Sequence, residues 1–231
     1  MKVIKKVIII IITICIIIIG YFGVQGYDMY KKAIETISIE DKISEIKNKK
    51  NYTKLDEIPR IYKEAVIAVE DHRFHKHNGI DIIAIGRAVF NDIKAMSFVE
   101  GGSTITQQLA KNIYFTQEKK IQRKFAEVFM AFKIEKNYSK DEILELYINT
   151  SFFGDNCYTV KEASRHYFGK EPINMTDYES VMLAGIPNAP SVYAPTKNLE
   201  LAKQRQKQVL SKMVKYKYLS KEDADKIINN K

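Results

Sequence analysis

An uninterrupted apolar run near the N-terminus constrains this chain more than any other feature. Residues 7–19 are apolar except for Thr13, and the apolar character continues to about Val24. A run of about 17–25 such residues crosses a bilayer as a helix, which satisfies its own backbone polar groups in lipid. A signal peptide is the alternative interpretation, but the run is long and no small-x-small cleavage sequence follows it. We therefore predict a transmembrane helix within residues 1–24.

The residues on either side of this run predict its orientation. Lys2, Lys5 and Lys6 precede it, and positive residues mark the cytoplasmic side of a membrane helix. We therefore expect a single-pass protein of the cell membrane, with a cytoplasmic N-terminus and everything after Val24 outside. Residues 25–51 are charged, carry a modest isoleucine stripe and predict a helical juxtamembrane stalk. Residues 52–231 then form the folded domain.

The overall charge limits the classes of partner. The 231 residues carry a formal net charge of +9, which favours a phospholipid surface, a nucleic acid or a phosphorylated substrate. The hydrophobic content of 45% is sufficient for a packed core. Cys15 lies in the apolar run and Cys157 far along the chain, so no intramolecular disulfide is expected.

Residues 101–112 have the pattern of a helix start that binds an anion. Their sequence is Gly-Gly-Ser-Thr-Ile-Thr-Gln-Gln-Leu-Ala-Lys-Asn. Ser103 and Thr104 are good N-caps, and Gln107 stands where a capping box needs it. A helix start presents free N–H groups to a phosphate. Helical spacing places four side chains along one side: Thr104, Gln107, Gln108 and Lys111. The pattern indicates a cradle for a phosphorylated ligand, and the simpler alternative is a well-capped surface helix.

An acidic and histidine-rich segment follows a second predicted helix. Pro59 is suited to the first position of that helix, which ends at Glu70. A carboxylate there faces the negative end of the helix dipole. A dry cleft would make this carboxylate a stronger base, which suits a general base near neutral pH, whereas nearby lysine and arginine would weaken it. Three histidines at 72, 75 and 77 also raise the possibility of zinc, but their spacing is not a known ligand pattern.

A third helix is predicted after residue 120. Apolar residues recur there with helical periodicity at 121, 125, 128, 129 and 132. On the polar side, Arg123 and Glu127 lie one turn apart and Lys124 is adjacent. The simplest account is a solvated ion pair on a helix surface.

Taken together, these segments resemble the signatures of the peptidoglycan glycosyltransferases (glycosyltransferase family 51), the transglycosylases that polymerise lipid II. The resemblance covers about residues 52–217, with five signatures in order: residues 70–81 (Glu-Asp-x-x-Phe-x-x-His-x-Gly-x-Asp), 101–112, 123–127 (Arg-Lys-x-x-Glu), the segment ending at 165–170, and the loop 187–195. Three positions depart from the family pattern. Ala126 stands where some members have lysine, while Asn156 and Thr159 stand where glycine is usual, which leaves the shape of that loop open.

The helical patterns predict a mainly α fold, and the resemblance implies a lysozyme-like helical domain with a small membrane-associated jaw. Residues 82–100 would form the jaw as two short amphipathic segments, with Met96, Phe98 and Val99 dipping into the lipid. The Lys and Arg residues of a last helix, capped by Asn198 and extending to about Lys217, are interpreted as a solvated or lipid-facing surface.

The resemblance also implies residue roles. Glu70 would be the catalytic base, and Glu127 a second catalytic acidic group that orients a basic side chain or holds a divalent cation, with Mg²⁺ or Mn²⁺ left open. Lys119 and Lys120 would partly replace the lysine absent at Ala126. The predicted substrate-binding residues are Asp71, Phe74, Ser103, Thr104, Gln107, Gln108, Lys111, Asn112, Arg123 and Lys124.

The implied reaction joins lipid II units into β-1,4 glycan strands with inversion and releases undecaprenyl pyrophosphate at the outer face of the membrane. Implied partners are lipid II, the growing lipid-linked strand, membrane phospholipid, penicillin-binding transpeptidases and other cell-wall assembly proteins, with no nucleic acid. A glycan-cleaving enzyme of lysozyme type and a catalytically silent scaffold are the alternatives. The ending after a basic helix favours a complete protein with one activity.

Overall fold

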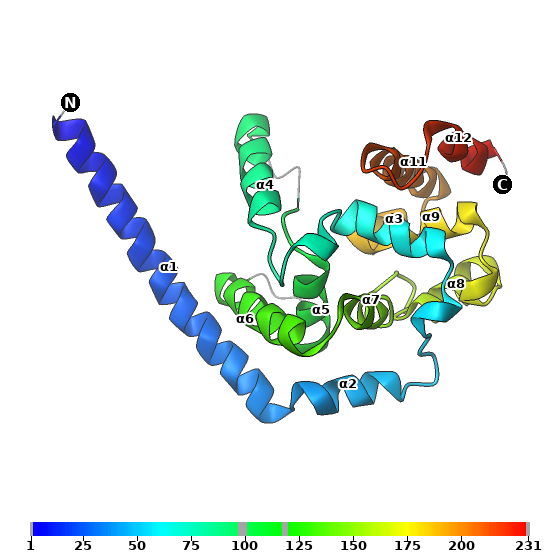
Figure 1. The fold of residues 1–231 in the computed structure, drawn as a ribbon, viewed down its shortest axis with the longest axis horizontal. Helices are drawn as coiled ribbons and strands as arrows, with labels where there is room; N and C mark the ends of the chain where they lie inside the picture. Colours follow the sequence, from blue (N-terminus) through cyan, green and yellow to red (C-terminus); the bar gives the residue numbers. More distant parts are fainter. Residues whose placement is uncertain (1, 97–100, 117–119, 230–231) are drawn as a thin grey trace.

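The structure is a computed structural model that describes residues 2–96, 101–116 and 120–229. Within these ranges the regular elements are α-helices and short 3-10 helices, without a strand, so the predicted mainly α class is confirmed (Figure 1). The α-helices are α1 (Lys2–Thr36), α2 (Ile39–Lys47), α3 (Arg60–Glu70), α4 (Ile82–Ala95), α5 (Ile105–Tyr114), α6 (Ile121–Asn137), α7 (Lys140–Ile148), α8 (Val160–Phe168), α9 (Asp177–Gly185), α10 (Pro190–Tyr193), α11 (Leu199–Lys215) and α12 (Lys221–Asn229). The 3-10 helices are η1 (Leu55–Glu57), η2 (Phe74–Lys76), η3 (Pro172–Asn174) and η4 (Ile186–Asn188).

Helix α1 continues well past the predicted membrane span. Between Ile4 and Thr36 it is long and apolar enough to cross a membrane by length and composition, and the most apolar stretch is not covered by the rest of the chain. The N-terminal half of α1 stands away from the body, while its other half passes beside α6 (Figure 1). This is consistent with membrane anchoring through one helix.

The second part of the predicted stalk packs with the domain. Ser38 caps α2, because its hydroxyl accepts a hydrogen bond from the backbone N–H of Asp41. The apolar stripe of α2 is then buried in the main hydrophobic core through Ile39, Ile43 and Ile46. Burial of three isoleucines ties residues 39–47 to the helical body rather than leaving them free as a spacer.

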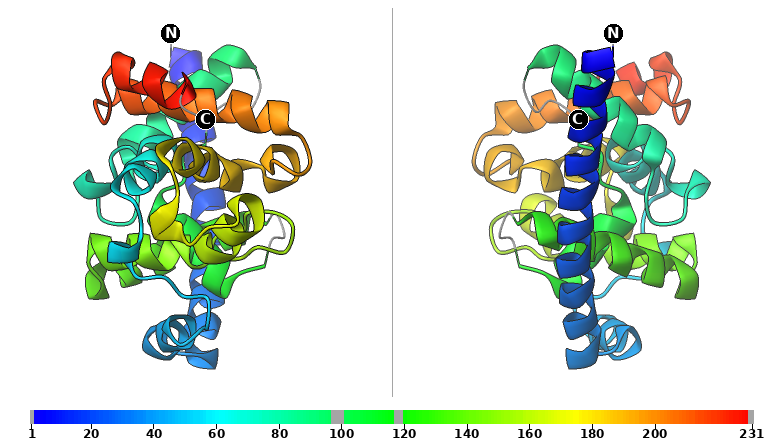
Figure 2. Two further views of the ribbon diagram at one scale, coloured as in Figure 1. Left: turned by 90° about the vertical axis from the view of Figure 1, so that its right-hand side faces the viewer. Right: turned by 90° about the vertical axis from the view of Figure 1, so that its left-hand side faces the viewer.

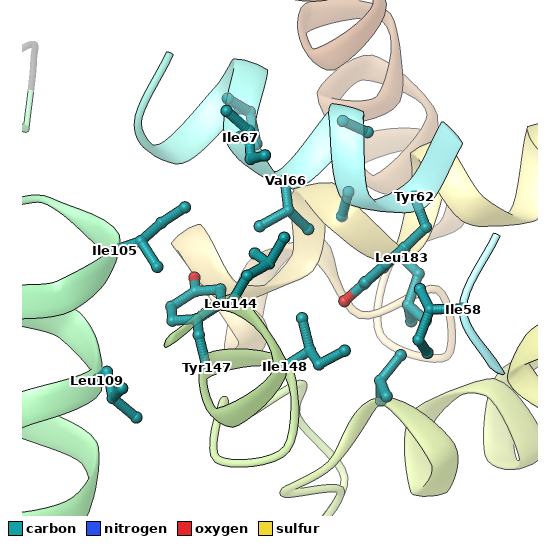
Figure 3. Packing of buried hydrophobic residues seen from close by; sticks show 14 of the residues in the cluster. Ile58, Tyr62, Val66, Ile67, Ile105, Leu109, Leu144, Tyr147, Ile148 and Leu183 are labelled. Carbon is teal, nitrogen blue, oxygen red and sulfur yellow. The ribbon is translucent and has the colours of Figure 1, made fainter. Parts of the chain in front are cut away.

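The main core lies where α3, α5, α7 and α9 meet (Figure 3). Tyr62 and Val66 of α3 are almost fully buried, as are Leu109 of α5, Tyr147 of α7 and Leu183 of α9. A fully buried side chain of this size contributes about 1.5–3 kcal/mol. This core fixes the ends of α3 and α5, which carry the residues of the candidate site.

Helix α4 differs from the two short segments that we predicted for the jaw. Residues 82–95 form one helix, capped by the Asp81 carboxylate and ended by Met96 in a left-handed conformation with φ 50. Only Ala88 in this helix is buried, although most of its side chains are apolar. The helix projects from the body on the same side as the N-terminal half of α1 (Figures 1 and 2). Phe98 and Val99 lie outside the described residues.

The loop before α8 shows how two departures from glycine are accommodated. Asn156 has φ 60, a conformation that asparagine tolerates better than most residues. Thr159 has an extended backbone with φ −138, and its hydroxyl caps α8 by accepting from the Glu162 N–H. One departure therefore keeps a glycine-like conformation, and the other adds a helix cap.

The C-terminal part contains helices that we did not predict, of which α10 is a short one within the predicted loop 187–195. Asn198 caps α11 as expected, but α11 ends at Lys215. A separate helix, α12, follows and buries Ala224 and Ile227 against the body. Its short amphipathic pattern, with only two buried positions, is too weak a signal to predict from sequence.

Candidate active site

Glu70 is the last residue of α3, as predicted, and its side chain is only 10% exposed. Its Oε2 accepts a hydrogen bond of 2.8 Å from Nε2 of Gln108 in α5. Tyr147 of α7 donates in turn to Oε1 of Gln108 at 3.3 Å. The other oxygen of Glu70, Oε1, is buried and accepts no hydrogen bond within the described part of the chain. One oxygen is thus held in position while the other is available to take a proton.

Arg205 of α11 lies beside the same carboxylate. We did not predict this contact from the sequence. Its Nη2 lies 3.9 Å from Oε1 of Glu70, and its Nε donates to the Gly185 carbonyl at 3.3 Å. The side chain is 12% exposed, so the prediction that the Lys and Arg residues of this helix form a surface is wrong for Arg205. No local pattern in the sequence signals this contact, since 135 positions separate Arg205 from Glu70.

A second buried carboxylate, Glu127 of α6, is surrounded by cations. Its side chain is 2% exposed. Arg123 Nη1 lies 3.3 Å from its Oε1, and Lys124 Nζ donates to its Oε2 at 2.9 Å. Lys124 also donates to Ser103 Oγ at 2.6 Å, which joins α6 to the segment before α5. Charge-assisted hydrogen bonds hold the Lys124 ammonium in a defined position, while Oε1 of Glu127 and Nε of Arg123 are buried without a hydrogen bond within the described residues.

Lys111 of α5 is close enough to both glutamates, and to Arg123 and Lys124, to feel their charges. Burial lowers the pKa of the Lys111 ammonium, and the positive charges of Arg123 and Lys124 lower it further, whereas Glu127 and Glu70 oppose this shift. The partly desolvated cluster combines three cations with Glu127, so it has a net positive charge. Such a site favours an anion such as a phosphate group.

The start of α5 does not provide the phosphate cradle that we predicted. The capping box is present, since Thr104 accepts from the Gln107 N–H and Gln107 accepts from the Thr104 N–H. The Asp71 carboxylate accepts from the Ile105 N–H at 3.1 Å. Thr104 and Gln107 are each 2% exposed. The protein's own carboxylate therefore takes the anion position at this helix start.

Two more predicted substrate-binding residues support the site from within. Asp71 is buried and contacts His77 Nε2 at 2.9 Å, so it joins the end of α3 to the start of α5. Phe74 is fully buried, with Lys140 Nζ 4.5 Å from the centre of its ring. A side chain without exposed surface cannot contact a substrate, and Phe74 is a core residue.

Ala126 lies on the part of α6 that packs on α1. Ala126 is fully buried, and its backbone faces α1 at Gly26 rather than the cluster around Glu127. Of the proposed replacements for the absent lysine, Lys119 lies outside the described residues, and Lys120 lines a small cavity with Arg123 beside Met29.

A cavity of about 310 Å³ is lined by Lys111 and by Gln108, the hydrogen-bond partner of Glu70. Gln108, Lys111 and Asn112 of α5 lie along one side of it. Phe152 and Tyr158 lie in its wall with ring centres 4.9 Å apart, and both are exposed. Exposed aromatic rings beside amide groups offer a flat apolar surface and hydrogen-bond partners together, as a sugar ring requires.

The donor set around Glu127 fits a divalent cation poorly. One carboxylate there faces two basic side chains, whereas Mg²⁺ and Mn²⁺ favour several oxygen ligands. Among the described residues, no group of three or more His, Cys, Asp or Glu side chains is placed to hold a metal ion. His77 pairs with Asp71, and the His72 ring stacks on Tyr216 with centres 3.9 Å apart. Glu127 is therefore better suited to orienting Arg123 and Lys124 than to holding a metal.

A helical body with a buried, half-bonded glutamate beside a desolvated cationic cluster has the features of an enzyme that removes a proton near an anionic leaving group. Comparison with known proteins identifies the family. The transglycosylase family model matches residues 39–214, and the chain belongs to this family, with its lysozyme-like fold.

Similar proteins include two bacterial penicillin-binding proteins. The chain is 48% identical to penicillin-binding protein 1F of Bacillus subtilis over 74% of its length, and 42% identical to penicillin-binding protein 1A of Neisseria lactamica over 86%. It spans about a quarter of the length of these relatives, 24% and 25%. A crystal structure of penicillin-binding protein 1A from Haemophilus influenzae matches with a TM-score of 0.46 and 26% identity, over 76% of this chain and 17% of that one.

Proposed function

We propose that this protein polymerises lipid II into β-1,4 glycan strands, with inversion at the anomeric carbon and release of undecaprenyl pyrophosphate. The observation that carries the proposal is the buried Glu70 carboxylate, which has one oxygen held by Gln108, the other unbonded, and its paired cation as far away as 3.9 Å. Membership of the transglycosylase family supports the same reaction class.

Glu70 acts as the general base. The 4-hydroxyl of the GlcNAc in lipid II attacks C1 of the MurNAc at the lipid-linked end of the growing strand, and its proton passes to the Glu70 carboxylate. The bond between C1 and the pyrophosphate oxygen breaks at the same centre. Arg205, 3.9 Å from Glu70, keeps a positive charge beside the carboxylate and helps to orient it.

The cationic cluster receives the leaving group. The bond electrons move onto the pyrophosphate, and stabilising developing charge with preorganised donors is usually the largest contribution to catalysis. Lys111, Arg123 and Lys124 provide this charge, and Glu127 orients the last two. The exposed rings of Phe152 and Tyr158 support sugar units next to Asn112.

The membrane elements bring the enzyme to its lipid substrates. Helix α1 anchors the chain with the N-terminus in the cytoplasm and the domain at the outer face. The side chains of Phe90 and Ile93 on α4 are 66% and 72% exposed, and they enter the outer leaflet, which covers their apolar surface. Confinement to the membrane plane raises the frequency of encounter. Penicillin-binding transpeptidases and other cell-wall assembly proteins are proposed partners.

The test is polymerisation of labelled lipid II by the purified protein in phospholipid, with Glu70→Gln beside it. Glu64→Gln is the matched control, since Glu64 lies on the same helix and pairs with Arg60 instead of the site. We expect glycan strands from the wild type and the control and none from Glu70→Gln, at unchanged lipid II binding. Absence of polymer from a folded wild type would refute the activity, while polymer from Glu70→Gln would refute the role of Glu70.

A further inference from the structure

Helices α1 and α6 touch backbone to backbone at one glycine. A Cβ atom on Gly26 would lie 2.3 Å from Cβ of Phe125 and 2.9 Å from the carbonyl oxygen of Gln122. Only glycine, which has no side chain, allows this approach. Gly20 and Gly23 of the same helix have nothing within 4 Å of such an atom, so the contact is specific to one position.

Contacts on both sides of Gly26 extend this approach into an ordered interface. Gln122 Nε2 donates to Oε1 of Gln25 at 2.7 Å. The Phe129 ring centre lies 5.3 Å from that of Tyr27 and 6.1 Å from that of Tyr30. We call this interface the α1–α6 seam, and its residues are Gln25, Gly26, Tyr27 and Tyr30 of α1 with Gln122, Phe125, Ala126 and Phe129 of α6.

The same segment of α6 carries the cationic cluster. Gln122 of the seam precedes Arg123 in the sequence, and Ala126 precedes Glu127. The backbone of α6 is therefore in contact with α1 on one side while its next residues face the cluster on the other. Because α6 also packs on α5, a displacement at the seam would move α1 relative to the whole cleft.

The seam begins where the apolar run ends. The helix is unbroken from Lys2 to Thr36, and the apolar run ends at about Val24, two residues before Gly26. At a rise of about 1.5 Å per residue, Gly26 lies about 3 Å beyond Val24 along the helix axis. The seam thus attaches α6 to the anchor at the boundary of the hydrocarbon, near the level of lipid phosphates.

We infer that the α1–α6 seam sets the depth of the cleft relative to the membrane, and that Gly26 is a positioning residue for the lipid-linked pyrophosphate. The inference rests on the proposed function. A rigid contact holds Arg123 and Lys124 at the level where the pyrophosphate of a membrane-embedded polyprenyl lipid lies. Without it, the anchor would keep the protein at the membrane but leave the height of the cleft undefined.

The test compares Gly26→Ala and Gly26→Leu with Gly23→Ala and Gly23→Leu in the full-length protein. Both positions lie in the middle of α1, so helix propensity changes equally in the two sets. Each protein is assayed on lipid II embedded in phospholipid vesicles and on a short-chain, water-soluble lipid II analogue. Misplacement by about 1 Å can cost up to about a hundredfold in rate, and we expect a loss of about tenfold or more for the Gly26 variants on the embedded substrate alone.

Three results would overturn the inference: unchanged activity of the Gly26 variants on both substrates, equal loss on both, or equal loss in the Gly23 variants. Equal loss on both substrates would mean that Gly26 supports the cleft itself and does not set its depth. A wild type that polymerises neither substrate would instead refute the proposed function.

Chemical cross-linking between the two helices tests the seam independently of activity. Gln25→Cys and Gln122→Cys are introduced after Cys15→Ser and Cys157→Ser, and the protein in vesicles is treated with a bis-maleimide whose spacer matches the reach of the two glutamine side chains. The side chains at 25 and 122 meet at their ends in the structure, so we expect efficient cross-linking, lost when Gly26→Leu is added and retained with Gly23→Leu. Failure to cross-link with Gly26 intact would overturn the seam and with it the inference.

Discussion

The two buried glutamates of the cleft, Glu70 and Glu127, have opposite surroundings. Glu127 is in contact with two cations, Arg123 and Lys124. Glu70 has a single amide donor, and its nearest cation, Arg205, is 3.9 Å away. Each carboxylate has one oxygen that accepts a hydrogen bond and one buried oxygen that accepts none within the described residues, so the two differ in the cations beside them. Differences in environment, not in residue type, assign an acid–base role to one and an electrostatic role to the other.

The largest effect that separates the two glutamates is expected from Glu70→Gln. Loss of a general base reduces turnover by about 10²- to 10⁴-fold. Because Glu70 accepts only one hydrogen bond, which glutamine can also accept, we expect the free energy of unfolding to change by less than about 1 kcal/mol. Lipid II turnover and chemical denaturation measure the two quantities, and a large loss of stability would contradict this view of Glu70.

Removing Lys111 tests whether the Glu127 end stabilises the leaving group. Lys111→Met is expected to reduce turnover by about 10²- to 10³-fold, as loss of one preorganised donor does. Burial lowers the pKa of Lys111, so the folded state disfavours its charged form, and the variant is expected to be more stable than the wild type at neutral pH.

The stability difference between Lys111→Met and the wild type should depend on pH. Between the lowered pKa of Lys111 and 10.5, its ordinary value, the unfolded chain binds more protons than the folded one, so wild-type stability rises with pH there. The stability advantage of Lys111→Met should therefore shrink as the pH approaches 10.5. Urea denaturation at several pH values measures it, and an advantage that does not change with pH would contradict the electrostatic cause.

Glu127→Gln, unlike Glu70→Gln, should destabilise the folded protein. It leaves Arg123 and Lys124 without their counter-charge, and we expect a loss of about 3 kcal/mol, the lower end for a broken buried pair, because Lys124 reaches solvent. Turnover should also fall as the two cations lose their orientation. Thermal unfolding beside lipid II turnover is the measurement, and stability equal to that of Glu70→Gln would remove the distinction between the two ends.

Arg205→Gln and Arg205→Lys test how much the charge beside Glu70 contributes to turnover. Because Nη2 of Arg205 lies 3.9 Å from Oε1 of Glu70 and both side chains are partly exposed, the charge of Arg205 should contribute about 1.4 kcal/mol or less. This corresponds to about tenfold or less in kcat. Lysine keeps the charge and should recover part of the activity, while glutamine should not. Steady-state kinetics separates kcat from KM, and identical kinetics for both variants would exclude an electrostatic role.

The smallest effect is expected from Thr104→Ala, at the start of α5 between the two ends. Loss of a helix N-cap costs about 0.5–2 kcal/mol. Because the Thr104 side chain is buried and bonded to Gly79 and Gln107, activity per folded molecule should not change. Thermal unfolding and turnover at low temperature distinguish this from a phosphate-binding role, which would require a fall in turnover.

Local signals predicted much of the fold and part of the site. The capping box at Thr104 and Gln107, the end of α3 at Glu70 and the pairing of Arg123 with Glu127 all depend on residues within four positions of one another. Burial does not follow from such patterns. The stripe on α3 is covered by α9 and α11, while the equally apolar side chains of α4 remain exposed, because periodicity predicts a helix but not its neighbour.

The sequence by itself determined the helical class, the apolar anchor and the identity of the acidic and basic side chains, since these depend on composition, period and short-range spacing. Only the tertiary structure decided which of them share a site. It brought Arg205 close to Glu70, 135 positions away in the sequence. It also placed the Asp71 carboxylate at the start of α5, buried Phe74 and packed Gly26 against α6. Those outcomes depend on the packing of helices distant in sequence, which no local pattern encodes.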